Sequence, residues 1–112
     1  MAQETWQNPS VTHSIIILFQ HILIIMKFQY DPDKSAANRA RHGINFDEAQ
    51  SLWDDPYLIE APANVMDEPR FLAVGMIGGR HWRAVFTYRN DRVQIISVRR
   101  ARRQEIDHYE SD

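Results

Sequence analysis

The sequence predicts an α+β protein, with a small antiparallel sheet packed against helices in the order β-α-α-β-β-β-β-α. Two observations carry this prediction: helix signals fill residues 31–54, and strands separated by tight turns fill most of the chain that follows. With 112 residues and 44% hydrophobic content, the chain suits one domain with a single core.

The helical half contains clear start and stop signals. A short strand, Lys27–Tyr30, leads into a helix that Asp31 can cap, with proline next at the first helical position. Gly43 is suited to end this helix. A second helix starts at Asn45, which is spaced to form a capping box with Glu48. The stripe expected to be buried on this helix consists of Phe46, Ala49, Leu52 and Trp53.

The second half alternates β-branched and aromatic residues between turn signals. Gly78-Gly79 and Asn90-Asp91 predict tight hairpin turns. A polar loop over residues 62–69 separates the first of these strands from the others. The expected strands are Tyr57–Ala61, Arg70–Ile77, Arg80–Tyr88 and Arg92–Arg100, and a short helix, Arg102–Glu110, follows them.

The first 25 residues differ from the remainder. Residues 14–26 are almost wholly apolar, but this segment is too short to span a bilayer comfortably and contains Gln20 and His21. No lysine or arginine precedes it, so it makes a poor signal peptide. We expect residues 1–25 to be an upstream extension with a non-native start, and residues 26–112 to be the domain. The alternative is that Ile15–Ile25 is an extra helix or strand covering an apolar face.

Positive charge is concentrated late in the chain. The segment Arg80–Arg103 holds eight arginines against one aspartate, a net charge of +7, so the rest carries −9 because the whole chain carries −2. Such polarity predicts one positive face for a polyanion, most obviously nucleic acid. Eleven of the thirteen cations are arginine, which binds phosphate through two hydrogen bonds. The alternative is that these arginines protect edge strands and pair with nearby acids.

Metal and disulfide chemistry have little support. The chain has no cysteine, and its five histidines show no short spacing typical of metal ligands. We therefore expect a cytoplasmic protein without a metal or another cofactor, and without a membrane-spanning segment.

Two motifs give the chain a resemblance to a known family. The pattern D-P-x-K-x-x-x-N-x-x-x-H-G covers residues 31–43, and I-I-S-V-R-R-A-R-x-x-E covers residues 95–105. Together with EPRFLAVG and GRHWRAVFTYR between them, they make residues 26–110 resemble the BrnT family, the toxin half of a bacterial type II toxin–antitoxin pair. The resemblance implies a RelE-like fold and a metal-independent ribonuclease that arrests translation. It also implies a cognate BrnA-type antitoxin with a ribbon–helix–helix part, which forms a hetero-oligomer with the toxin.

Metal-free RNA cleavage needs a base, an acid and cations that stabilise the charged phosphorane. The catalytic candidates are Arg99, Arg83, His81, His42 and Glu105. Candidates for RNA binding are Arg70, Arg80, Arg89, Arg100, Arg102, Arg103 and Tyr109. Structural roles remain open for several: His42 suits a helix C-terminus, Glu105 can pair with Arg102 or Arg99, and Tyr109 is spaced as core. His108 is expected to be plain surface.

Strand alternation places these candidates relative to one another. His81 and Arg83 should share one face of their strand, and Arg99 and Arg100 should point to opposite faces. We expect Arg99 to be catalytic because it ends a rigid strand, whereas Arg102 and Arg103 should bind RNA or remain solvated. Two rival functions stay open: a non-catalytic nucleic-acid-binding domain, and a module that only docks an acidic antitoxin.

Overall fold

The computed structural model describes residues 5–8, 27–63 and 68–111, and it confirms the predicted α+β class and order of elements. A 3-10 turn, η1, extends the second helix directly. The elements are β1 (Lys27–Gln29), α2 (Pro32–His42), α3 (Phe46–Ala49), η1 (Gln50–Asp54), β2 (Ile59–Ala63), β3 (Arg70–Ile77), β4 (Arg80–Arg89), β5 (Arg92–Arg100) and α4 (Arg103–Glu110).

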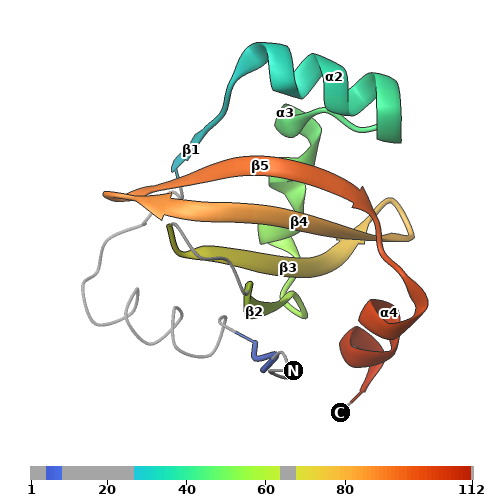
Figure 1. Cartoon of the computed structure of the whole chain (residues 1–112). Helices are drawn as coiled ribbons and strands as arrows, with labels where there is room; N and C mark the ends of the chain where they lie inside the picture. The colour runs from blue at the N-terminus through green and yellow to red at the C-terminus, as the bar shows by residue number, and fades with distance from the viewer. Residues whose placement is uncertain (1–4, 9–26, 64–67, 112) are drawn as a thin grey trace.

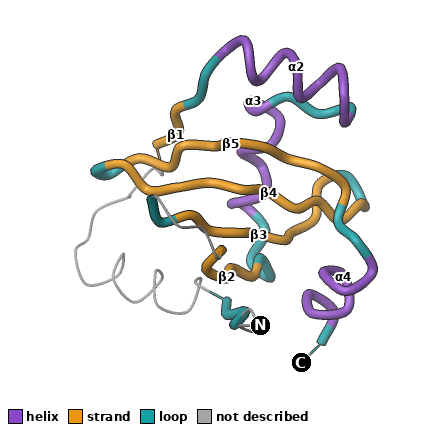
Figure 2. The backbone as a smooth tube through the Cα atoms, viewed as in Figure 1, coloured by secondary structure: helices purple, strands orange, loops and turns teal. Residues whose placement is uncertain are grey.

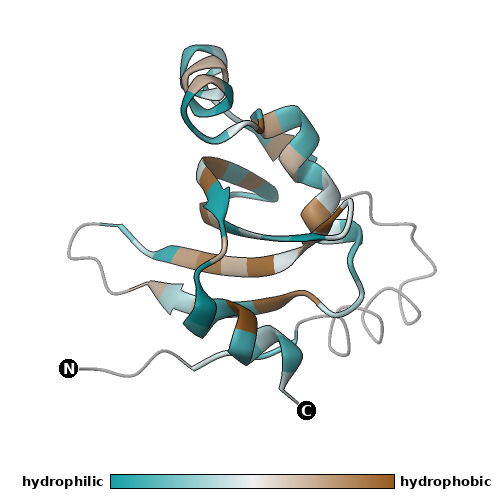
Figure 3. Cartoon of the chain, turned by 90° about the vertical axis from the view of Figure 1, so that its right-hand side faces the viewer, coloured by the Kyte–Doolittle hydropathy of each residue, from teal (hydrophilic) through white to brown (hydrophobic). Residues whose placement is uncertain are grey.

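The strands form one sheet in the order β1-β5-β4-β3-β2 (Figures 1 and 2). Strands β2 to β5 pair with their neighbours in antiparallel fashion, as predicted. Strand β1 is the exception, because it runs parallel to β5, with Lys27 opposite Arg92. The helices α2 and α4 lie at opposite ends of the molecule in two perpendicular views (Figures 1 and 3).

The predicted ends of β3 and β5 are confirmed, whereas β2 begins two residues later than predicted. The reason lies in a turn around Asp55. Its Oδ1 atom accepts a hydrogen bond from the Tyr57 backbone N–H at 2.9 Å, and its carbonyl accepts one from Leu58 at 3.1 Å. These bonds hold the two residues in a turn, so strand pairing starts only at Ile59.

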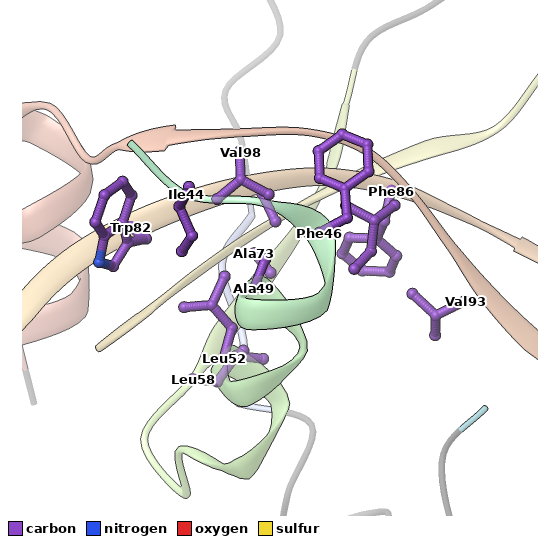
Figure 4. Packing of buried hydrophobic residues seen from close by; sticks show 12 residues of the cluster. Ile44, Phe46, Ala49, Leu52, Leu58, Ala73, Trp82, Phe86, Val93 and Val98 are labelled. Carbon is purple, nitrogen blue, oxygen red and sulfur yellow. The ribbon is translucent and has the colours of Figure 1, made fainter. Parts of the chain in front are cut away.

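The core lies between α3–η1 and one face of the sheet, which we call the inner face. Phe46, Ala49 and Leu52 are buried as predicted and pack against strand residues such as Phe86 and Val98 (Figure 4). The predicted fourth member of the stripe, Trp53, is only partly buried against this cluster. Hydrophobic residues are accordingly concentrated along the middle strands (Figure 3).

The local signals read from the sequence are present in the structure. Asp31 caps α2, and Gly43 ends it in the left-handed region at φ 81°. Asn45 and Glu48 form the predicted capping box. The turn between β3 and β4 has both glycines at positive φ, 58° and 78°, which is the requirement of a type I′ hairpin.

One buried side chain fixes α2 to the sheet. Asn38 donates through Nδ2 to the carbonyls of Ile44 at 2.8 Å and Val98 at 2.9 Å, and its Oδ1 accepts from Val98 N at 3.1 Å. Its amide therefore bonds both backbone groups of Val98, as a neighbouring strand would, beyond the short stretch that pairs with β1. The Ser35 hydroxyl similarly accepts from Phe46 N at 2.9 Å.

The apolar run predicted as an extension, including Ile15–Ile25, lies outside the described residues. Residues 5–8 are described, and Gln7 pairs with Glu60 of β2 through two backbone hydrogen bonds of 2.9 and 2.8 Å. Within the part of the chain that the structure describes, no helix is long and apolar enough to cross a membrane.

Candidate functional site

The face of the sheet away from α3, here called the outer face, carries the central pair of arginines. Arg83 of β4 lies directly opposite Arg99 of β5 in the antiparallel register. The predicted placement of His81 on the face of Arg83 agrees with this register, in which His81 pairs with Met76. Arg100 points to the inner side, where its guanidinium lies 5.5 Å from the centroid of the Trp82 ring. Alternation thus correctly separated Arg99 from Arg100.

Arg99 is held by a bidentate ion pair with Glu105. Its two terminal nitrogens each lie 2.9 Å from one carboxylate oxygen, and only 16% and 14% of the two side chains are exposed. The Nη1 atom also donates to the carbonyl of Arg100 at 2.9 Å. Of the two partners that the sequence left open for Glu105, the structure selects Arg99. Arg102 contributes its backbone N–H to the same carboxylate at 2.8 Å.

These contacts set the ionisation of Glu105. Burial by itself raises the pKa of the carboxyl, but the hydrogen bonds from Arg99 and from the Arg102 backbone outweigh it. The positive charges of Arg99 and Arg83 act in the same direction. The net result is a pKa below the ordinary value, so Glu105 is a carboxylate at neutral pH.

A pocket of about 280 Å³ opens beside this ion pair, and we call it the arginine pocket. It is lined by Leu72, Arg83, Arg99, Arg102, Gln104, Glu105 and His108. Three arginines against one glutamate leave an excess of two positive charges with the histidine neutral. Such a pocket suits a phosphate group, because arginine binds phosphate oxygens in pairs.

Sequence reasoning missed Gln104 and His108 as members of this pocket. His108 was predicted to be plain surface, and it is indeed exposed, but it lies on the wall of the pocket. One signal was available: His108 follows Glu105 by three residues, a spacing that puts both side chains on the same face of a helix.

Polar contacts attach α4 to the rest of the domain, and two candidate residues take part in them. Tyr109 donates from its hydroxyl to Asp55 Oδ2 at 2.7 Å, and burial together with this hydrogen bond raises the pKa of Tyr109. His81 Nε2 lies 2.7 Å from Glu110 Oε1, and the His81 ring packs edge-on against Tyr109. Both residues therefore support the helix that carries Glu105 and His108.

The remaining candidates do not line the arginine pocket. His42 ends α2, and Arg70 begins β3 with Ala63 as its strand partner. Two arginines pair with acids: Arg89 with Glu68 at 3.2 Å, and Arg103 with Asp107 at 3.8 Å. Arg80 is exposed and follows the glycine turn. The eight arginines of residues 80–103 are thus spread over several surfaces, and three of them meet at the pocket.

A second pocket of about 420 Å³ adjoins the same helix, and we call it the aromatic pocket. Its walls come from residues 6–8, from the turn before β2 with the first residue of that strand, and from α4 with the residue that follows it. They are Trp6, Gln7, Asn8, Tyr57, Ile59, His108, Tyr109 and Ser111. His108 belongs to both pockets, so the two are neighbours.

Comparison with known proteins gives one result. No curated protein matches the chain. A protein family described as "Ribonuclease toxin, BrnT, of type II toxin-antitoxin system" matches residues 30–105, well over half of the chain. The matched span runs from the end of β1 to Glu105 and includes every residue of the arginine pocket except His108. The chain therefore belongs to the BrnT family of ribonuclease toxins of type II toxin–antitoxin systems.

Proposed function

We propose that this chain is a metal-independent endoribonuclease that cuts RNA and thereby arrests translation, with the arginine pocket as its active site. The observation that supports this most directly is the convergence of three arginines, one carboxylate and one imidazole in a single pocket. Membership of a ribonuclease toxin family supplies the substrate class. The pocket supplies the groups that RNA cleavage by the 2′-hydroxyl requires without a metal.

In the proposed reaction, the ribose 2′-oxygen attacks the adjacent phosphorus while the Glu105 carboxylate removes its proton. The bond between phosphorus and the 5′-oxygen then breaks, and His108 gives a proton to that leaving oxygen. Arg83 and Arg99 stabilise the negative charge that builds up on the phosphorane. The products are a 2′,3′-cyclic phosphate and a 5′-hydroxyl end.

Two histidines compete for the role of general acid. His108 lines the pocket, whereas His81 sits beneath α4 with its Nε2 atom bonded to Glu110. We therefore place His108 in this role and assign His81 to holding the helix. His108→Ala should lower the single-turnover cleavage rate by about 10²- to 10⁴-fold, the usual contribution of general acid catalysis. His42→Ala is the matched control, because it removes a histidine that does not line the pocket.

The chemistry is tested with two RNA oligonucleotides that differ at one sugar. Replacing the 2′-hydroxyl at the cleavage position by hydrogen should abolish cutting, since no internal nucleophile remains. Cutting of the unmodified RNA should continue in EDTA and leave a 2′,3′-cyclic phosphate. Cleavage of the deoxy-substituted RNA, or full inhibition by EDTA, would contradict the mechanism. Binding without any cleavage would instead favour a non-catalytic nucleic-acid-binding role.

The same pocket suits an inhibitory partner. We propose that a cognate BrnA-like antitoxin binds the toxin as a hetero-oligomer in the cytoplasm and covers the arginine pocket with an acidic segment. Opposite charges steer such association and make it fast. A complex in which Arg83 and Arg99 remain open to solvent would rule out this mode of inhibition.

A further inference from the structure

We infer that the aromatic pocket binds a nucleobase of the RNA, next to the phosphate held in the arginine pocket. This inference rests on the proposed function and adds a base-binding subsite to it. It involves Trp6 and Tyr57, which lie outside both the arginine pocket and the two sequence motifs.

Stacking rings form the walls of the aromatic pocket. Trp6 and His108 lie nearly parallel, with ring centroids 6.0 Å apart and an angle of 28° between their planes. Tyr57 is 70% exposed, the most open large hydrophobic side chain among the described residues. Single-stranded RNA is bound through such rings, because each base can stack on an aromatic face. The volume of about 420 Å³ gives space for a base beside them.

The position of the pocket matches the shape of a nucleotide. His108 lines both the aromatic pocket and the arginine pocket, so the two pockets share this side chain. A nucleotide likewise joins a charged phosphate to a flat, uncharged base through one sugar. RNA crossing α4 at His108 can therefore place a phosphate among the arginines and a neighbouring base among the rings.

The backbone on either side of the aromatic pocket is hydrogen-bonded to neighbouring residues. Gln7, next to Trp6, is hydrogen-bonded to β2, and Asn8 donates from its side chain to the carbonyl of Pro56 at 2.9 Å. On the other side, Ser111 donates from its hydroxyl to the carbonyl of His108 at 2.8 Å, where it caps the end of α4. A pocket held in shape before binding loses less entropy when the base enters.

The first test uses the native full chain and observes its three tryptophan indole N–H signals by NMR. Adding uridine or adenosine monophosphate should shift the Trp6 signal and leave those of Trp53 and Trp82, which pack against or within the core, nearly unchanged. Ribose 5-phosphate, which lacks the base, should shift none of the three. If the monophosphates fail to move the Trp6 signal, or ribose 5-phosphate moves it equally, the pocket does not bind a base.

The second test compares cleavage of ordinary RNA with RNA that lacks a single base beside the cleaved bond. For the native chain, removal of that base should raise KM roughly tenfold, which is within the range for one stacked base. Trp6→Ala and Tyr57→Ala should raise KM for ordinary RNA similarly, and should erase the difference between the two RNAs. Trp6→Phe and Tyr57→Phe keep a stacking ring, so these variants should retain most of the difference in KM between the two RNAs.

The outcomes separate this inference from the proposed function. If the native chain cleaves RNA but both alanine variants keep the full native penalty for the missing base, the base-binding subsite is wrong and the ribonuclease site stands. If the native chain neither binds nor cleaves RNA, the proposed function is overturned, and this inference with it. A variant that merely loses structure would slow both RNAs equally and keep the difference between them, so it would not imitate the predicted result.

Discussion

The Arg99–Glu105 ion pair links two groups with different proposed roles, Arg99 as charge stabiliser and Glu105 as base. The arginine lowers the pKa of the carboxyl, which by itself makes Glu105 a weaker base. In the proposed reaction, the phosphate would compete with Glu105 for the Arg99 guanidinium. A guanidinium shared with the phosphorane would hold Glu105 less tightly, and the carboxylate would then be a better base. The pair is thus suited to couple proton removal to charge stabilisation.

Arg99→Ala should reduce single-turnover cleavage by about 10²- to 10³-fold, the usual cost of removing one preorganised charge stabiliser. Arg102→Ala should retain cleavage and toxicity, because the contact of Arg102 with Glu105 is made by its backbone N–H. Saturating enzyme removes binding from the comparison. Arg99→Ala cleaving at the native rate would show that Arg99 is structural.

Stability should fall in acid through Glu105. Its pKa is lower in the folded chain than in the unfolded one, so the folded state binds the proton less readily. The stabilisation is complete above the ordinary value of 4.5 and is lost as the pH falls through the lowered pKa. In urea denaturation, the difference in free energy of unfolding between the native chain and Glu105→Gln should be constant above pH 5.5 and shrink below 4.5. A difference that stays constant down to pH 3 would contradict this assignment.

At the scale of elements, the part of β5 beyond its pairing with β1 has a side chain as its hydrogen-bonding partner. Asn38 of α2 bonds both backbone groups of Val98, and the helix has only one other buried residue, Ser35. A helix with so little apolar surface gains its position from these polar bonds. The asparagine in the motif of residues 31–43 therefore has a structural explanation.

Asn38→Ala should lower the free energy of unfolding by about 2–4 kcal/mol, because it leaves buried backbone groups of Val98 and Ile44 without partners. Arg39→Ala is the matched control on the same helix. The Arg39 side chain forms an exposed ion pair with Glu48, so its loss should cost less than about 1 kcal/mol. Urea denaturation of the two variants measures both values. Equal losses would mean that Asn38 is no more important than a surface residue.

The sequence predicted elements well where the signal is local. The caps at Asp31 and Asn45 and the glycine turn depend on neighbouring residues and were found correctly. The parallel pairing of β1 with β5 was not predicted, since it joins segments far apart in the chain. The late start of β2 depends on hydrogen bonds to Asp55, which strand patterns do not reveal.

In the candidate site too, the features that depend on local strand geometry were predicted, and those that depend on distant segments were not. Alternation alone was sufficient to bring His81 and Arg83 to one face and to separate Arg99 from Arg100. It could not show that α4 folds back across that face, and for this reason His108 was overlooked. The aromatic pocket was equally hidden, because its walls come from residues about 50 positions apart, at Trp6, Tyr57 and His108.

At the scale of the whole molecule, the arginines that give residues 80–103 a net charge of +7 are divided among several surfaces. Three arginines line the pocket, and Arg99 among them is paired with Glu105. Outside the pocket, Arg89 pairs with Glu68 and Arg100 stacks on Trp82. Three phosphate contacts on single-stranded RNA predict a slope of about −2 for log K against log salt, compared with about −6 if all eight arginines of residues 80–103 took part. Arg102→Ala should flatten the slope by about 0.7, whereas Arg103→Ala should leave it unchanged, because Arg103 does not line the arginine pocket.

The expectation about the N-terminal residues also concerns the whole molecule. We propose that a chain beginning at Met26 folds with a loss of less than about 2 kcal/mol in free energy of unfolding, since the core cluster of the described residues and the hydrophobic residues packed against it all lie within residues 28–98. It should lose preference for the base beside the cleaved bond, because Trp6 is gone. Thermal or urea denaturation measures the first effect. A larger loss would show that the segment is an integral part of the fold.

The pairing of β1 with β5 determines the stage of synthesis at which the sheet can be completed. The groups proposed to carry out cleavage, Arg83, Arg99, Glu105 and His108, all belong to the last third of the chain. The edge strand β1 emerges from the ribosome first, but its partner β5 follows only after β2, β3 and β4. A nascent fragment that stops before residue 105 lacks Glu105 and therefore the ion pair with Arg99. On the proposed mechanism, we expect such a fragment not to cleave RNA on the ribosome that is synthesising it.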